Sequence, residues 1–182
     1  MKVTPQPPME AWKDFHYCPK CGTENEYNKK NPSNPFCCCH CGFTQYFNPS
    51  IGVVGILVNK QNECLLLERG REPAKGKFGL PGGFADFNES AEDGLKREIY
   101  EETKLSPSSF KYLYSDTNLY PFKSVLYHVI DIFFVCSLNS FHGIELQESE
   151  VTGFLITIPK KEHLDRMAFK SNRKALEIYY DL

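Results

Sequence analysis

The pattern of apolar and polar positions changes near residue 48. From residue 51 onward, runs such as IGVVGILV and ECLLLER alternate with turn segments, which is typical of strands in a globular core. Two further segments have helical spacing, and in the second the residues Ala175, Leu176 and Tyr179 form an apolar stripe. The predicted strands lie at 51–58, 63–69, 110–116, 123–138 and 151–158, and the predicted helices at 91–103 and 171–180.

The segment before residue 48 lacks this pattern. Residues 17–43 are rich in Cys, Asn, Pro and Gly and contain almost no aliphatic side chains, so this segment cannot build a core without a cross-link or a metal. Three prolines fall within the first eight residues. We therefore divide the chain into an N-terminal tail at 1–14, a small cysteine-rich module at 15–48 and a larger domain at 49–182.

Six of the eight cysteines lie between Cys18 and Cys41, and four of them form the ends of two C-x-x-C-G units separated by sixteen residues. This spacing predicts one tetrahedral zinc site made by Cys18, Cys21, Cys38 and Cys41. Because four thiolates fill the coordination shell, the zinc is expected to be structural. Cys37 and His40 also have the spacing of ligands, the role of Cys39 is open, and a set of disulfides or free thiols is the alternative to zinc.

Composition narrows the class of protein. The 182 residues carry a formal net charge of -2, so no overall basic character favours nucleic acid as a partner, although lysines near the cysteines leave RNA binding open. The N-terminus has no apolar run of the kind found in a secretory signal, and the apolar stretches are too short or interrupted to span a membrane. We expect a cytoplasmic protein with no membrane partner.

The first predicted helix carries an acidic stripe. Ser90 is its expected N-cap, with Asp93 as capping partner, and Glu98, Glu101 and Glu102 fall within an arc of about 100°. A solvated helix face is one explanation. The other is a site for Mg²⁺ or Mn²⁺, which prefer oxygen ligands and commonly act on phosphates. The preceding turn, Leu80-Pro81-Gly82-Gly83, would let backbone approach such an ion or its substrate.

This constellation resembles the box of the Nudix hydrolases, G-x5-E-x7-R-E-U-x-E-E-x-G-U, where U is a bulky aliphatic residue. One position departs from the box, because Lys104 stands where the family has Gly, and we expect it to cost local stability or to shift the helix end. The matching residues are Gly83, Glu89, Arg97, Glu98, Ile99, Glu101, Glu102 and Leu105.

The resemblance implies an α/β fold, an α/β/α sandwich around a mixed sheet, with hydrolysis of nucleoside diphosphates linked to another moiety. It implies that Glu98, Glu101, Glu102 and the Gly83 carbonyl hold the catalytic metal, while Arg97 and Glu89 form a pair that aims Glu98. The general base is either a glutamate of the box or a later one, for which Glu145, Glu148 and Glu150 are candidates. Glu150 is the first choice, because the family often places a Glu just before the strand predicted at 151–158. A homodimer is one possible assembly.

A zinc ribbon ahead of a Nudix domain is similar in arrangement to the NADH pyrophosphatases. Their S-Q-P-W-P-F-P-x-S segment is matched only in part, at Tyr120-Pro121-Phe122. Tyr120 or Phe122 would stack on a base in a functional version, or serve packing alone. NADH, ADP-ribose and other small-molecule nucleotide substrates therefore stay open. A nucleotide sensor and a protein that binds RNA or processes its 5' end are the alternatives.

Overall fold

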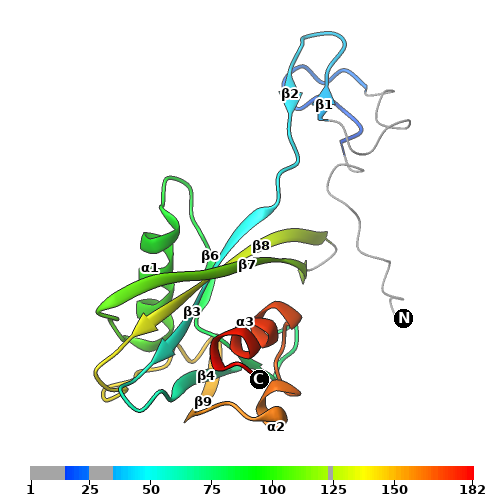
Figure 1. Cartoon of the computed structure of the whole chain (residues 1–182). Helices are drawn as coiled ribbons and strands as arrows, with labels where there is room; N and C mark the ends of the chain where they lie inside the picture. Colours follow the sequence, from blue (N-terminus) through cyan, green and yellow to red (C-terminus); the bar gives the residue numbers. More distant parts are fainter. Residues whose placement is uncertain (1–14, 25–34, 123–124) are drawn as a thin grey trace. The chain divides into compact units, whose positions relative to one another are not determined.

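The computed structural model describes residues 15–24, 35–122 and 125–182. The chain divides into two compact units (Figure 1). The first comprises Met1–Pro49 and Leu119–His128, and the second comprises Ser50–Asn118 and Val129–Leu182. The segment 119–128, which we assigned to the larger domain from the sequence, thus groups with the cysteine-rich residues.

A seven-stranded mixed sheet organises the larger part of the chain (Figure 1). Five strands follow the order β5-β4-β3-β8-β7, while β6 pairs with β3 and β9 pairs with β4. The strands β3 and β8 run parallel, whereas β4 and β6 run antiparallel to β3. The strands are β3 (Ser50–Val58), β4 (Cys64–Arg69), β5 (Phe78–Gly79), β6 (Gly82–Phe84), β7 (Ser109–Phe122), β8 (Val125–Ser137) and β9 (Val151–Thr157).

Helices cover both faces of this sheet. Because side chains alternate between the two faces of a strand, Val53 and Leu57 of β3 pack with Leu95 and Ile99 of α1 (Ala91–Thr103). The other face of β3 packs against Leu176 of α3 (Lys170–Tyr180) and against the short α2 (Lys161–Leu164). The α/β/α sandwich expected from the sequence is confirmed. Among the described residues, no helix is both long and apolar enough to cross a membrane.

The longer predicted elements are confirmed with small changes at their ends. The helix predicted at 91–103 has these bounds, and the strand predicted at 110–116 extends to Ser109–Phe122. The sequence did not predict β5, β6 or α2, which have two, three and four residues. Elements this short carry too little periodicity to be recognised without their tertiary contacts.

Both ends of α1 follow from local chemistry. Ser90 is the N-cap, and its hydroxyl accepts a hydrogen bond from the Asp93 N–H at 3.1 Å. At the other end Lys104 adopts the left-handed conformation, with φ 59°, and its N–H bonds to the Tyr100 carbonyl. The helix end is therefore not shifted by the absent glycine. Lys104 takes the glycine conformation instead, at the steric cost that a side chain carries there.

In the first unit, the described part of the cysteine-rich module is built on a two-stranded antiparallel sheet of β1 (Phe36–Cys37) and β2 (Thr44–Gln45). Phe36 is 1% exposed and packs with Cys18 and Cys38. Phe15, Phe43 and Phe47 surround this small cluster. Aromatic rings supply its apolar contacts, since aliphatic residues are nearly lacking.

Candidate functional site

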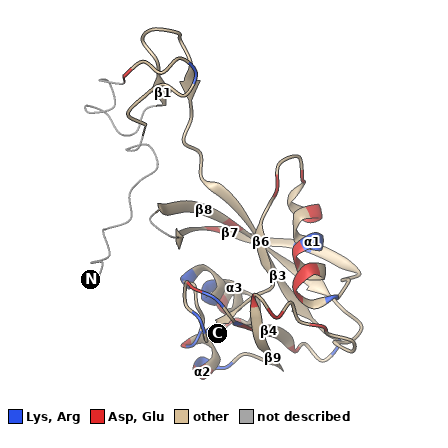
Figure 2. Cartoon of the chain, turned by 180° about the vertical axis from the view of Figure 1, so that it is seen from behind, with Lys and Arg blue, Asp and Glu red and all other residues tan. Residues whose placement is uncertain are grey.

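The acidic stripe of α1 lies against β6. The Gly82 N–H donates a hydrogen bond to Glu102 Oε2 at 3.0 Å. A Cβ atom on Gly83 would lie 2.5 Å from the Glu98 Cδ, so the Glu98 carboxylate occupies the space that a side chain at position 83 would need. Figure 2 shows the acidic positions that recur along α1. The main chain at Gly82 and Gly83 therefore lies in direct contact with Glu102 and Glu98, two of the three glutamates.

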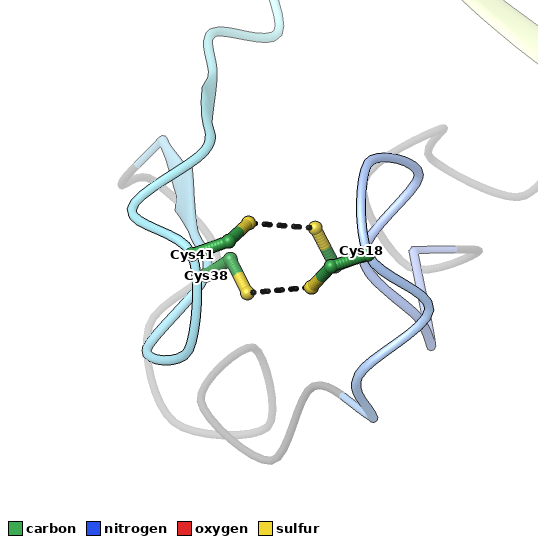
Figure 3. Close-up of side chains that lie close together, drawn as sticks. Cys18, Cys38 and Cys41 are labelled. Atoms are coloured by element: carbon green, nitrogen blue, oxygen red, sulfur yellow. Dashed lines mark hydrogen bonds between the residues drawn. The ribbon is translucent and has the colours of Figure 1, made fainter.

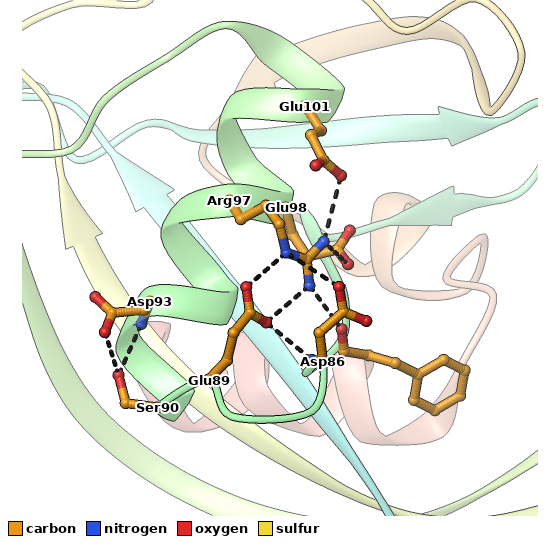
Figure 4. Close-up of polar contacts among 8 residues, drawn as sticks. Asp86, Glu89, Ser90, Asp93, Arg97, Glu98 and Glu101 are labelled. Atoms are coloured by element: carbon orange, nitrogen blue, oxygen red, sulfur yellow. Dashed lines mark hydrogen bonds and ion pairs between the residues drawn. The ribbon is translucent and has the colours of Figure 1, made fainter.

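Arg97 lies at the centre of the polar contacts (Figure 4). Its Nε and Nη2 donate to the two carboxylate oxygens of Glu89 at 2.8 and 3.0 Å. Its Nη1 donates to Glu98 at 2.8 Å and to Glu101 at 3.3 Å, and Nη2 also donates to the Phe84 carbonyl at 3.0 Å. Each of its three nitrogens thus has a partner, and Arg97 joins the helix to the loop before it.

Burial raises the pKa of two of these acids. It raises the pKa of Glu102 from 4.5 to about 8; the Gly82 hydrogen bond opposes this rise, and the negative charges of Glu98 and Glu150 add to it. Burial also raises the pKa of Glu98, against the hydrogen bond from Arg97. By contrast, Arg97 lowers the pKa of Glu89. Grouped carboxylates with raised pKa values are costly to ionise when no cation is near. A divalent cation offsets this cost, so such a group is suited to bind one.

Among the three later glutamates, Glu150 is the one that the structure brings to this site. Its charge contributes to the raised pKa of both Glu98 and Glu102. Its carboxylate pairs with Arg71 Nη2 at 2.6 Å, and its carbonyl accepts the Gly70 N–H at 2.7 Å. Glu145 and Glu148 are exposed.

Glu89 and the three glutamates that Arg97 joins to it or that lie beside them, Glu98, Glu101 and Glu102, form what we call the acidic cluster. A pocket of about 430 Å³ lies beside the start of α1, and Glu89 is one of its lining residues. Its lining is partly apolar and partly acidic. The lining includes the apolar residues Ile51, Phe84, Ala85 and Ile132 and the acidic residues Asp86 and Glu89. The pocket offers room for an organic group next to the carboxylates.

The four cysteines predicted as ligands converge on one point (Figure 3). Their sulfur atoms lie within 4.8 Å of one another, with Cys18 and Cys41 separated by 3.7 Å and Cys21 and Cys38 by 3.6 Å. A tetrahedral ion with metal–sulfur bonds of about 2.3 Å would hold its sulfurs about 3.8 Å apart. The donor set therefore fits a single tetrahedral metal ion.

The two halves of this cluster are built alike. The Gly22 N–H bonds to the Cys18 carbonyl, and the Gly42 N–H bonds to the Cys38 carbonyl. Both glycines have φ near 70°, which a residue with a side chain rarely adopts. Cys37, Cys39 and His40 are exposed and lie outside the cluster, so the Gly after each C-x-x-C identified the converging pairs.

The two predicted substrate contacts are grouped with the first unit. Tyr120 and Phe122, at the end of β7, belong to the first unit, whereas the acidic cluster belongs to the second. Sequence reasoning also missed two residues near the acidic site, Arg69 and Arg71. Arg69 is the last residue of β4 and Arg71 lies in the loop after it, and no local spacing ties either arginine to the glutamates of the box.

Comparison with known proteins agrees with this architecture. The family model described as the NUDIX domain matches residues 48–176, and the chain therefore belongs to the Nudix family. Relatives by sequence include the ADP-ribose pyrophosphatase of Methanocaldococcus jannaschii, 41% identical over 92 residues, which are 50% of this chain and 52% of that protein. The NAD-capped RNA hydrolase NudC of Haemophilus influenzae is 29% identical over 143 residues, covering 76% of this chain and 50% of NudC. The chain thus spans about half the length of these curated relatives.

Solved structures show the same fold. A NUDIX hydrolase from Nitrosomonas europaea superposes with a TM-score of 0.61 at 23% identity, covering 91% of this chain and 90% of its own. The NUDIX domain of Shewanella oneidensis NrtR, crystallised with ADP ribose, also gives a TM-score of 0.61, at 21% identity and covering 75% of this chain and 89% of that one.

Proposed function

We propose that this protein is a pyrophosphohydrolase that uses Mg²⁺ or Mn²⁺ to cleave the diphosphate bond of a nucleoside diphosphate linked to another moiety. The observation that carries the proposal is the group of carboxylates on one face of α1, ordered by Arg97 and approached by Glu150. A merely solvated acidic face would not need partly buried glutamates whose pKa values are raised by burial.

In this proposal Glu98, Glu101, Glu102 and the Gly83 carbonyl hold the metal. The bound ion supplies charge neutralisation on the phosphate oxygens. Arg97, locked onto Glu89, positions the Glu98 and Glu101 carboxylates. Glu150 acts as general base and takes a proton from the attacking water. The water oxygen bonds to phosphorus, and the anhydride oxygen leaves with the electron pair on the departing phosphate.

ADP-ribose and NADH are the first substrate candidates. Supporting ADP-ribose, a relative named ADP-ribose pyrophosphatase is 41% identical to half of this chain. Supporting a substrate that contains NAD, other relatives are named NAD-capped RNA hydrolase and NAD(P)H pyrophosphatase. The pocket beside Glu89 offers room for one of the two organic ends. Tyr120 and Phe122 remain candidates for stacking on a base.

The cysteine cluster has a separate, structural role in this proposal. We assign it Zn²⁺, because four thiolates close the tetrahedral shell and leave no position for a substrate. The domain bounds that we propose are 1–14 for the tail, 15–48 for the ribbon and 49–182 for the hydrolase domain. We further expect a cytoplasmic location, where reducing conditions keep the four thiols free for metal, and a homodimer as one possible assembly.

The test is a panel of NADH, ADP-ribose, dinucleoside polyphosphates, nucleoside triphosphates and NAD-capped RNA, assayed with Mg²⁺ or Mn²⁺ by identifying the released products. Glu101→Gln and Glu102→Gln should each abolish hydrolysis while the circular dichroism spectrum is kept, whereas Glu148→Gln, at an exposed position, serves as control. Full activity in both variants would refute the metal site. Cleavage of no compound by the wild type would instead favour a nucleotide sensor.

NAD-capped RNA is the second candidate, because curated relatives carry that name over 76% of this chain. Capped RNA and free NADH should be compared at several salt concentrations. A preference for the RNA that weakens steeply with salt would favour this candidate, since contacts to an RNA backbone release counterions.

A further inference from the structure

Three arginines interact with the carboxylates of the site, namely Arg97, Arg69 through its charge on Glu102, and Arg71 through Glu150. They differ in how many of their hydrogen-bond donors are already used. Arg97 donates from all three of its nitrogens to Glu89, Glu98, Glu101 and the Phe84 carbonyl. Arg69 donates its Nε to the Pro73 carbonyl at 2.8 Å, and its Nη2 has no hydrogen-bond partner but is buried, out of reach of a ligand in solvent. Arg71 has a single ion-pair partner among the described residues, Glu150, and its side chain is 56% exposed.

The backbone that carries Arg71 is held in place. The Arg69 N–H bonds to the Lys77 carbonyl at 2.9 Å, and the Gly76 N–H bonds to the Arg69 carbonyl at 2.8 Å, so the loop is closed at its base. The Gly70 N–H then ties the loop to the Glu150 carbonyl at 2.7 Å. Strands β4 and β9 pair with Arg69 opposite Val151, which sets the two segments side by side. Arg71 can therefore change partner by rotating its side chain, with its backbone already beside Glu150.

The ion pair that such a change would break is a weak one. Partly exposed pairs contribute about 0–1 kcal/mol to stability, because water screens both charges. A guanidinium binds a phosphate through two parallel hydrogen bonds, which are stronger than ordinary ones. A diphosphate entering beside Glu98, Glu102 and Glu150 would also need a cation in addition to any bound metal. Among the three arginines, Arg71 is the one with accessible donors to spare.

We infer that Arg71 exchanges partners during binding: it pairs with Glu150 in the substrate-free protein and transfers to a phosphate oxygen of the bound diphosphate, which releases the Glu150 carboxylate. This inference rests on the proposed function, since it places the diphosphate at the same site. Arg71 thereby couples the arrival of a diphosphate to the freeing of the general base. A ligand without phosphate leaves the Arg71–Glu150 ion pair intact.

The inference can be tested by binding, without turnover. The probe is α,β-methylene-ADP, whose bridging carbon resists hydrolysis, titrated in the presence of Mg²⁺ by calorimetry. Arg71→Gln should raise the dissociation constant about tenfold. Arg71→Lys should raise it less, because a lysine keeps the charge but cannot make the two parallel hydrogen bonds of a guanidinium. Lys75→Gln removes an exposed cation from the same loop and should change binding less than about twofold.

The exchange also predicts a coupling between the two residues. Glu150→Gln frees Arg71 in the unbound protein and should tighten probe binding about threefold, an effect that should largely disappear when Arg71→Gln is already present. Equal effects of Glu150→Gln in both backgrounds would mean simple charge repulsion, and would overturn the exchange. Unchanged binding in Arg71→Gln, or no binding by the wild type, would overturn it as well.

Failure of the inference and failure of the proposed function are distinguishable. A wild type that hydrolyses ADP-ribose while Arg71→Gln keeps the same KM supports the function and refutes the exchange. If Arg71 exchanges partners in the wild type, Arg71→Gln should raise the KM for ADP-ribose about tenfold and change kcat less than about threefold, because the substitution removes a binding contact. If the probe binds as expected but no compound of the panel is cleaved, the phosphate contact stands and the hydrolase assignment falls.

Discussion

The most specific physical prediction concerns Glu102 and the stability of the protein without added catalytic metal. In the folded chain, burial raises the pKa of this carboxyl from 4.5 to about 8. The unfolded chain exposes it to water, where it ionises near its ordinary pKa. Between these two values the folded state holds a proton that the unfolded state releases, so stability falls as the pH rises. Glu102→Gln has nearly the same shape and cannot ionise, and it should therefore escape this loss.

The magnitude follows from the pKa difference. Each pH unit above 4.5 lowers the free energy of unfolding by about 1.4 kcal/mol until the pH approaches 8, and the loss at pH 7 is then about 3 kcal/mol. At pH 5 it is about 1 kcal/mol. The amide oxygen of the glutamine can still accept the Gly82 N–H, so no hydrogen bond need be lost. Glu102→Gln should therefore stabilise the protein, and by more at neutral than at acidic pH.

Urea unfolding followed by circular dichroism measures this difference. Wild type and Glu102→Gln are compared at pH 5 and pH 7, in buffer without added Mg²⁺ or Mn²⁺ and without chelator, so that the cysteine site is left undisturbed. Adding Mg²⁺ should then stabilise the wild type more than the variant, because the ion favours the ionised carboxylate.

The matched control is Glu101→Gln. The Glu101 side chain is 49% exposed, so its ionised form is largely hydrated in the folded protein. Glu101→Gln should therefore change the free energy of unfolding by less than about 0.5 kcal/mol. If Glu102→Gln is no more stable than the wild type at pH 7, or gains equally at both pH values, Glu102 is not a buried acid and the reasoning is wrong.

The remaining predictions address backbone, helix end and zinc. Gly83→Ala would place a Cβ 2.5 Å from the Glu98 Cδ, and the displaced carboxylate should cost about 100-fold in kcat; Gly79→Ala, whose nearest contact is 3.8 Å, should keep full activity in the same assay. Lys104→Gly relieves the left-handed strain and should raise the free energy of unfolding by about 1 kcal/mol in urea, whereas a loss of stability would mean that the contact of Lys104 with the Tyr100 ring outweighs the strain. Metal analysis of protein purified without chelator should find about one zinc ion per chain, and Cys38→Ser should remove it; well under one in the wild type would contradict the zinc assignment.

Local interactions explain why α1, its N-cap and its acidic stripe could be predicted from the sequence. Ser90 caps a backbone N–H three residues away, and the glutamates share a face because of the helical repeat, so each relation lies within a few residues. The strand β3 was visible for a similar reason, since its apolar run serves two buried faces. The cysteine pairs repeat one local turn, and a glycine in each marks it.

Contacts between distant segments had no such signal. Arg71 meets Glu150 because β9 lies beside β4, and nothing near either residue in the chain specifies that pairing. Glu102 is a partly buried acid because β6 places the Gly82 N–H against it, although the spacing of the glutamates alone is equally compatible with a solvated face. Periodicity and turn chemistry act over a few residues and identify which side chains lie together on one element. Strand order and the path of the loops decide which elements come into contact, and they depend on the free energy of the whole core. They therefore also decide the pKa of Glu102 and the pairing of Arg71 with Glu150.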